Sequence, residues 1–286
     1  MRFAPYVGIN GYLWPLEVEN TIAFWSEQLK GVRNKRPLMI GVSADQNSLL
    51  CDKSLQEKRY APGSRIQHVF RTDDSAKVLN LIHYNTNNPN TLSDQLLRLT
   101  DLGGRRLHGF QLNDLSINRP AVRERIISEL AKYCVNYPNV RIILQTSSAV
   151  VSELENVFGE KAPNELARHI ASFGGFVSDI LFDMSGGTGK LLDAEKAMRY
   201  LSVIHQENSS LGLGVAGGLE GRVLPGLSDL FFTFRNLNID TERKMKDVQG
   251  RFDWLVVHEY LSIAAEFCGT IDDPADPYEQ PSLINR

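Results

Sequence analysis

The chain has 286 residues, of which 42% are hydrophobic and 23% charged, and this balance suits a globular protein with a sizeable core. A net charge of −3 without a concentrated basic stripe argues against nucleic-acid binding, and no apolar run approaches the ~20 residues of a membrane span. The first residues lack the apolar stretch of a secretory signal, so we expect a cytoplasmic protein without a membrane partner.

Short apolar runs alternate with helical patterns along the whole chain. Apolar residues spaced three and four apart, such as Val18, Ile22, Trp25 and Leu29, predict helices between the runs. The runs themselves predict eight strands: Tyr6–Ile9, Leu38–Val42, Leu79–Ile82, Leu107–Leu112, Arg141–Gln145, Asp179–Phe182, Leu211–Val215 and Leu237–Ile239.

A strand followed by a helix, repeated along the chain, gives parallel strands with right-handed crossovers. An open doubly wound sheet uses the same units, but eight units in about 250 residues favour the closed (β/α)₈ TIM barrel. We therefore predict an α/β protein with one barrel domain over residues 1–268 and a short acidic, Pro-rich C-terminal tail over residues 269–286. The connection over residues 46–74 is long, and is either an extended active-site loop or an insertion.

Polar residues follow the apolar runs, at the end of the barrel where the carboxyl ends of the strands converge. In such barrels the active site lies at this end, so we expect these side chains to surround a hydroxylated ligand. They are Asn10, Asp45, His83, Asn85, Gln111, Asn113, Gln145, Asp183, Asp240 and Glu242.

Two glycine-rich segments follow the sixth and seventh predicted strands. They contain Gly186, Gly187, Thr188 and Gly189 in the first, and Gly217 and Gly218 in the second. Glycine lets backbone N–H groups converge on an anion, and a helix beginning just after Gly218 would add its N-terminal donors. The pair predicts a barrel of the phosphate-binding type.

These residues resemble phosphoribosylanthranilate isomerase, a (β/α)₈ barrel. Asp183 followed by the first glycine segment, and Ala216-Gly217-Gly218-Leu219, match the family at its sixth and seventh strands. Ile9-Asn10-Gly11 stands where the family has Ile-Cys-Gly. The chain is more similar still to a divergent branch of the family. In that branch the sequences Leu-Ile-His-Tyr-Asn and Leu-His-Gly-Phe-Gln-Leu-Asn recur, which here are residues 81–85 and 107–113.

The resemblance implies an Amadori rearrangement, with Asp183 as the general acid and the residue at position 10 as the base that removes a proton from carbon. Asn10 occupies the place of that cysteine, and its amide has no basic form near neutrality. The family's Ser-Ser-Gly turn after the eighth strand is also missing. His83, whose ordinary pKa suits proton transfer near pH 7, is the alternative partner for Asp183.

Three functions remain compatible with the sequence. The first is an enzyme that acts on a phosphorylated or polyhydroxylated small molecule by acid/base chemistry. The second is a barrel that binds a phosphorylated metabolite without catalysis, and the third is an authentic isomerase with a replaced base. We expect no cofactor, and no metal either, because Asp45, His83 and Asp183 lack local ligand spacing. The sequence does not define an oligomeric state.

Overall fold

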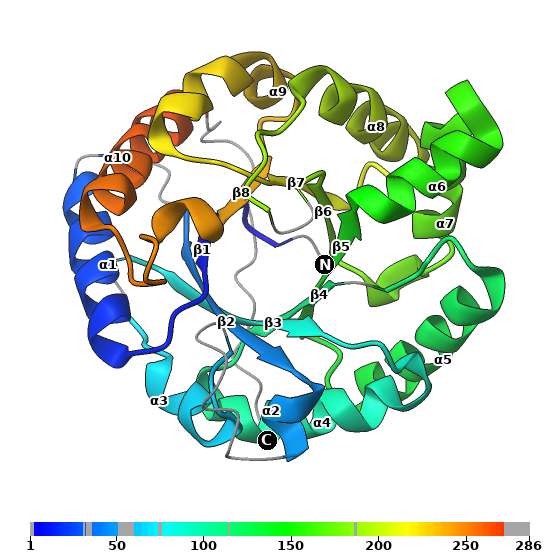
Figure 1. Ribbon diagram of the computed structural model, residues 1–286, viewed down its shortest axis with the longest axis horizontal. Coiled ribbons are helices and arrows are strands. Elements are labelled where there is room, and N and C mark those ends of the chain that lie inside the picture. Colours follow the sequence, from blue (N-terminus) through cyan, green and yellow to red (C-terminus); the bar gives the residue numbers. More distant parts are fainter. Residues whose placement is uncertain are drawn as a thin grey trace.

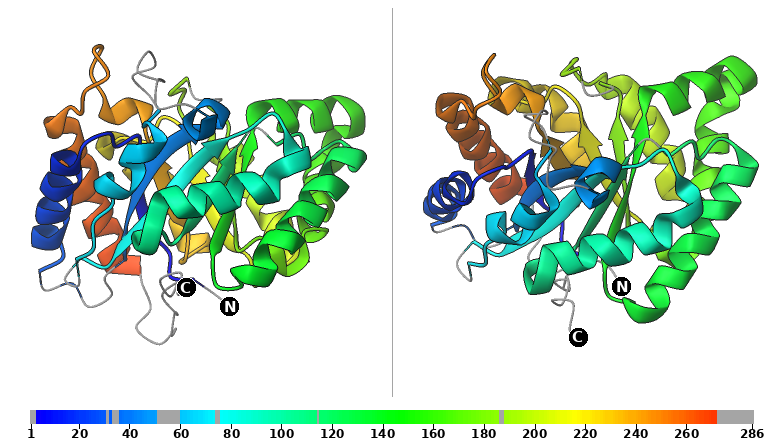
Figure 2. Two further views of the ribbon diagram at one scale, coloured as in Figure 1. Left: turned by 90° about the horizontal axis from the view of Figure 1, so that it is seen from below. Right: turned by 60° about the horizontal axis from the view of Figure 1, so that its bottom comes forward.

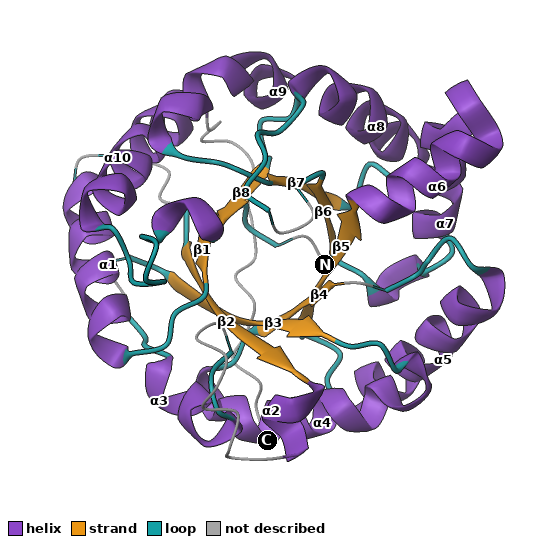
Figure 3. Ribbon diagram, in the orientation of Figure 1, coloured by secondary structure: helices purple, strands orange, loops and turns teal. Residues whose placement is uncertain are grey.

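Eight parallel strands close into a barrel in the computed structural model, with each strand paired to the next and β8 paired to β1 (Figures 1 and 3). The structure describes residues 3–30, 32, 36–50, 60–73, 76–113, 115–185 and 188–271. The strands are β1 Val7–Asn10, β2 Leu38–Asp45, β3 Val78–Asn85, β4 Gly109–Asn113, β5 Arg141–Ser147, β6 Asp179–Asp183, β7 Gly212–Ala216 and β8 Asn238–Thr241. The predicted (β/α)₈ barrel is confirmed.

Helices form a ring around the outside of the barrel (Figure 3). They are α1 Pro15–Gln28, α2 Gln46–Leu50, α3 Ile66–Val69, α4 Leu92–Gly103, α5 Pro120–Asn136, α6 Ser148–Phe158, α7 Ala162–Ala171, α8 Ala194–Glu207, α9 Ser228–Thr233 and α10 Trp254–Ile271. None of the helices formed by the described residues is both long and apolar enough to span a membrane.

Strand residues alternate between two apolar layers, because successive side chains point to opposite faces of a sheet. Val7 and Ile9 of β1 belong to the large core between the barrel and the helices. A smaller cluster fills the barrel interior and consists of Tyr6, Met39, Leu79, Leu81, Ile143, Leu181 and Ala216. Above this cluster the inward-facing residues become polar, and this change defines the end of the barrel that carries the site.

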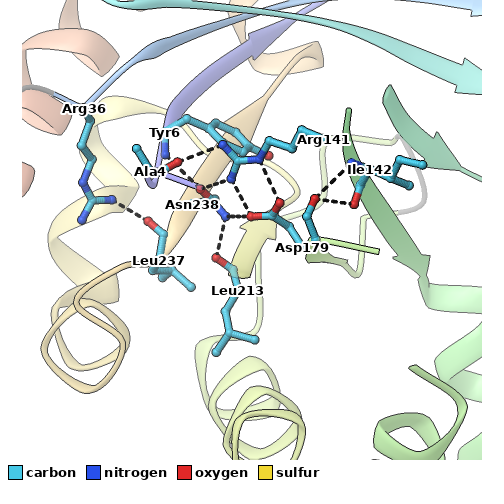
Figure 4. A network of polar contacts seen from close by, with 10 residues as sticks. Ala4, Tyr6, Arg36, Arg141, Ile142, Asp179, Leu213, Leu237 and Asn238 are labelled. Carbon is cyan, nitrogen blue, oxygen red and sulfur yellow. Dashed lines mark hydrogen bonds and ion pairs between the residues drawn. The ribbon is translucent and has the colours of Figure 1, made fainter. Parts of the chain in front are cut away.

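The other end of the barrel is closed by a buried network centred on Arg141 of β5 (Figure 4). Its guanidinium donates to both carboxylate oxygens of Asp179 on β6, at 2.8 and 2.5 Å. It also reaches the carbonyl of Ala4 at 2.9 Å and the side-chain oxygen of Asn238 on β8 at 3.3 Å. The Asn238 amide donates in turn to Asp179 at 3.0 Å. The network therefore ties β5 and β6 to β8 and to the segment before β1.

Several element ends differ from the predicted ones. β2 and β3 continue to Asp45 and Asn85, three residues beyond the apolar runs that predicted them. The long connection after β2 contains α2 and α3, while its residues 51–59 lie outside the described part. The final helix runs to Ile271, so residues 269–271 of the predicted tail are helical, and residues 272–286 are outside the described part.

Candidate active site at the carboxyl ends of the strands

A cavity of about 730 Å³ lies at the carboxyl ends of the strands. Its lining draws on β1, β3, β4, β5, β6, β7 and β8 and on the loops that follow β6, β7 and β8. Among the predicted site residues it includes Asn10, His83, Asn85, Gln111, Asn113, Gln145, Asp183, Gly189, Gly217, Gly218, Asp240 and Glu242. The polar residues at the strand ends thus converge on one space.

Two predicted residues do not line this cavity. Asp45 ends β2, and its Oδ1 accepts hydrogen bonds from the backbone N–H (2.9 Å) and hydroxyl (3.1 Å) of Ser48. Its carboxylate is engaged at the start of α2, because the chain turns into that helix directly after β2. Thr188 donates its hydroxyl to the Ser185 carbonyl at 2.6 Å and so braces its own loop. The predictions for Gly186 and Gly187 lie outside the described residues.

A chain of side-chain amides crosses the floor of the cavity. The Asn10 amide donates to Asp240 Oδ2 at 2.7 Å and to Gln111 Oε1 at 3.4 Å. Gln111 then donates to Gln145 Oε1 at 2.8 Å, and Gln145 donates to Asp183 Oδ2 at 2.8 Å. We call these five residues the amide chain. It runs between two carboxyl groups, one on β8 and one on β6.

Asp240 is the more deeply buried of the two carboxyl groups. Only 2% of the residue is exposed, and this burial, with the nearby charges of Glu242 and Asp183, raises its pKa well above the ordinary value. Donors such as Gln111 oppose the shift without cancelling it. The environment therefore favours the neutral acid, which can donate a proton.

Asp183 lies in a different setting at the end of β6. Its Oδ1 accepts the backbone N–H of Ser185 at 2.8 Å, while its Oδ2 accepts the Gln145 amide. Gly217 lies against it, since a Cβ built there would be 2.9 Å from Asp183 Oδ1, and the φ of Gly217 is +107°. Two N–H donors on separate oxygens suit a charged carboxylate that accepts a proton.

Asn10 is held by its neighbours rather than presented as a reactive group. Its side chain lies over Gly41 of β2, and a Cβ at position 41 would overlap Asn10 Oδ1. Its amide nitrogen is occupied by Asp240 and Gln111. Position 10 therefore supplies a hydrogen-bond donor where the resemblance implied a base.

His83 lies on β3, in register with Gln111 of the amide chain on the neighbouring strand β4. Its residue is 6% exposed, and its Nδ1 is 4.0 Å from Glu242 Oε2, an ion-pair distance when the imidazole is protonated. The pair joins β3 to the segment after β8. It provides a second titratable group facing the same cavity.

The glycine segments pack against each other. A Cβ at Gly218 would lie 2.6 Å from the Lys190 carbonyl oxygen and 2.7 Å from that of Gly189, so glycine permits this close contact between loops. No α-helix begins just after Gly218; a 3₁₀ helix, Gly221–Leu227, follows, and α9 starts only at Ser228. The helix N-terminus considered from the sequence is therefore displaced from this loop.

The sequence reasoning missed the basic residues after β8. Arg243 lines the cavity, and a Cβ built at Gly189 would lie 3.5–3.7 Å from its side-chain carbons. Lys246 also lines it and donates to the Gly11 carbonyl at 2.7 Å. Lys246 pairs with Phe252 at the base of an antiparallel hairpin that stands above the rim (Figure 2). No motif in the sequence marked Arg243.

The described residues contain no cluster of three or more His, Cys, Asp or Glu side chains arranged to hold a metal ion. In comparisons with known proteins, no family model matches the chain, and the curated proteins include no significant match.

Proposed function

We propose that this protein is an enzyme that moves protons on a phosphorylated or polyhydroxylated, sugar-like small molecule. The observation that carries the proposal is the pair formed by Asp240 and Asp183, two carboxyl groups that line one cavity in unlike environments. Two carboxyl groups in one site whose environments differ in this way commonly serve as one acid and one base.

The roles follow from the surroundings of each group. Asp240, which burial keeps neutral, donates a proton to an oxygen of the ligand, while Asp183 removes a proton from carbon. His83 with Glu242 is the alternative base, since it faces the same cavity. Amides such as Asn85 and Asn113 are suited to bind hydroxyl groups, because each amide both donates and accepts.

An anionic group on the ligand is supported by the cations after β8. Arg243 and Lys246 line the same cavity as Gly217 and Gly218. A guanidinium binds phosphate through two parallel N–H groups, so Arg243 can take over the part that the missing Ser-Ser-Gly turn would have played. We therefore place the ligand's phosphate beside Arg243.

Authentic phosphoribosylanthranilate isomerase activity is not what this cavity favours. Asn10 offers a donor and no base, and the described lining contains no Phe, Tyr or Trp to pack against an aromatic ring. The same Asn10 favours the second candidate function, a cytoplasmic barrel that binds a phosphorylated metabolite without catalysis.

Hydrogen exchange with solvent tests the catalytic proposal. The purified protein is incubated in deuterated water with a panel of pentose and hexose phosphates and with phosphoribosylanthranilate. We expect deuterium on a carbon next to the carbonyl of at least one sugar phosphate, and no turnover of phosphoribosylanthranilate. Asp183→Asn and Asp240→Asn should each lose about 10²–10⁴-fold in rate, while Asp229→Asn, an exposed residue of α9, is the matched control. Binding of a sugar phosphate without exchange would instead identify the non-catalytic barrel.

Thermal stability tests the anion site separately. A ligand that binds only the folded state stabilises it by RT ln(1 + [L]/Kd), so phosphate at ten times its Kd should add about 1.4 kcal/mol. Arg243→Gln should weaken this effect, whereas Arg222→Gln, whose side chain pairs with Glu220, should retain it. A melting temperature that phosphate and every sugar phosphate leave unchanged would contradict the site.

A further inference from the structure

Gln111 and Gln145 are the two amides in the middle of the chain between Asp240 and Asp183. They lie on the neighbouring strands β4 and β5 and are 1% and 6% exposed. The two side chains contact each other, and their outer ends reach Asn10 and Asp183. Their polar atoms are therefore used within the protein, although the sequence predicted that both bind substrate.

The hydrogen bonds of these amides run in one direction. A side-chain amide has an accepting end and a donating end, so fixing one end fixes the other. Gln145 turns its N–H₂ toward Asp183, which leaves its oxygen to accept from Gln111. Gln111 is thereby oriented with its own oxygen toward Asn10. In a buried chain each bond polarises the next, so the charge at one end influences the other end.

We propose that Gln111 and Gln145 are positioning residues that join Asp183 and Asp240 into one coupled acid–base pair. The proposal rests on the proposed function for the use of the pair in catalysis, but the coupling itself is a property of the protein without ligand. When the substrate gives one proton to Asp183 and takes one from Asp240, the number of protons on the pair is unchanged. Neutralising Asp183 removes a negative charge that disfavours ionisation of Asp240, so the first transfer assists the second.

The titration midpoint of Asp240 depends on every charged or titratable group close to its carboxyl. Besides Asp183, its charged neighbour is Glu242, and the hydroxyls of Tyr6 and Tyr260 are also close enough to interact with it electrostatically. The direct effect of Asp183 through space persists when the amides are changed. A double-mutant cycle separates that direct effect from the part carried by the amides.

The experiment measures the titration midpoints of the two carboxyl groups by NMR on protein labelled with ¹³C at the aspartate carboxyl carbon. Asp183→Asn and Asp240→Asn identify the two signals. Asp183→Asn should lower the midpoint of Asp240 by about 1 pH unit in the otherwise wild-type protein, the size at which two sites titrate as a pair. In the Gln145→Met background the same substitution should lower it by less than half as much.

Gln111→Met interrupts the chain at its other amide and provides the measurement if Gln145→Met does not fold. Ser147→Ala is the matched control, because Ser147 lies on the same strand as Gln145 and lines the same cavity outside the chain. An equal shift in the wild-type and Gln145→Met or Gln111→Met backgrounds would overturn the proposal. Since no ligand is used, that result would leave the proposed function standing, just as failure of the exchange experiment would leave the coupling standing.

Discussion

At the scale of single residues, Asp240 occupies an unfavourable position for a charged group. It is fully enclosed at the end of β8, and burial raises its pKa. The folded protein therefore keeps this proton at pH values where the unfolded chain has lost it, so it binds more protons than the unfolded chain. Stability must then fall as pH rises from about 4, the ordinary value of an aspartate, toward the raised value.

Asp240→Asn should remove this dependence. Asparagine keeps an oxygen to accept the Asn10 amide but carries no proton to lose. Between pH 4 and neutrality the unfolding free energy of the wild type should fall relative to the variant by up to about 1.4 kcal/mol per pH unit. Urea unfolding at a series of pH values measures the difference. His108, whose pKa burial lowers to about 4, titrates in both proteins, and its effect therefore cancels.

The prediction would be wrong if the two proteins lost stability in parallel as the pH rose. Asp229→Asn, which changes an exposed carboxylate, should follow the wild type throughout.

Sequence alone could identify the members of the amide chain, because each is a polar residue at the end of an apolar run or within one residue of it. The sequence could not separate these residues from Asp45. The carboxylate of Asp45 binds Ser48 instead of lining the cavity, because the chain turns into α2 directly after β2. The sequence could not find Arg243 either, because an arginine in a loop carries no pattern, and only closure of the barrel brings it close to Gly189. The roles of the amide-chain residues and of Arg243 are set by contacts across the barrel, whereas that of Asp45 is set by the helix that follows its strand.

At the scale of elements, the carboxyl ends of the strands combine polar side chains with glycines that make room for them. Asn10 of β1 and Gly41 of β2 are paired in register, and both face the barrel interior. Inward-facing polar residues such as Ser43 and His83 also explain why β2 and β3 extend beyond the predicted runs: they interrupt the apolar pattern while the strands continue. The ends of site-bearing strands are thus the part that hydrophobic patterning marks least well.

Gly41→Ala should disturb the site through this contact. The added methyl would overlap Asn10 Oδ1, so Asn10 must rotate away from Asp240 and Gln111. We expect a loss of about 1–3 kcal/mol in unfolding free energy, as for other overpacked interiors, together with weaker binding of any sugar phosphate found by the exchange panel. Calorimetry and ligand titration measure the two effects.

Gly175→Ala provides the control, because a Cβ there would meet nothing within 4 Å and the effect should be small. Equal effects of the two substitutions would contradict the close packing of Asn10 on Gly41.

At the scale of the whole molecule, the two ends of the barrel use polar groups differently. At the carboxyl ends of the strands, amides and carboxyl groups surround a cavity, whereas at the opposite end Arg141, Asp179 and Asn238 fill the interior (Figure 4). In barrels of this kind the first end carries chemistry and the second contributes stability.

Repeated strand–helix units predicted the closed barrel, but the charged residues that close the end opposite the cavity lay inside predicted strands and had no sequence pattern of their own. Arg141 and Asp179 are recognisable as partners only once β5 and β6 are adjacent.

Arg141→Met should destabilise the barrel strongly, because it leaves the Asp179 carboxylate buried without its partner. Breaking a buried ion pair from one side costs about 3–5 kcal/mol, and here the carbonyl of Ala4 also loses its donor. The double variant Arg141→Met/Asp179→Asn should recover much of the loss, since the remaining charge is gone and the introduced amide oxygen can still accept from Asn238.

Arg168→Met, which breaks an exposed pair with Glu165 on α7, should cost less than about 1 kcal/mol. Urea unfolding of the four proteins at pH 7 gives the comparison. If the double variant were no more stable than Arg141→Met, the buried charge would not be the cause, and the loss would come from the packing of the arginine over Tyr6 and Phe3 instead.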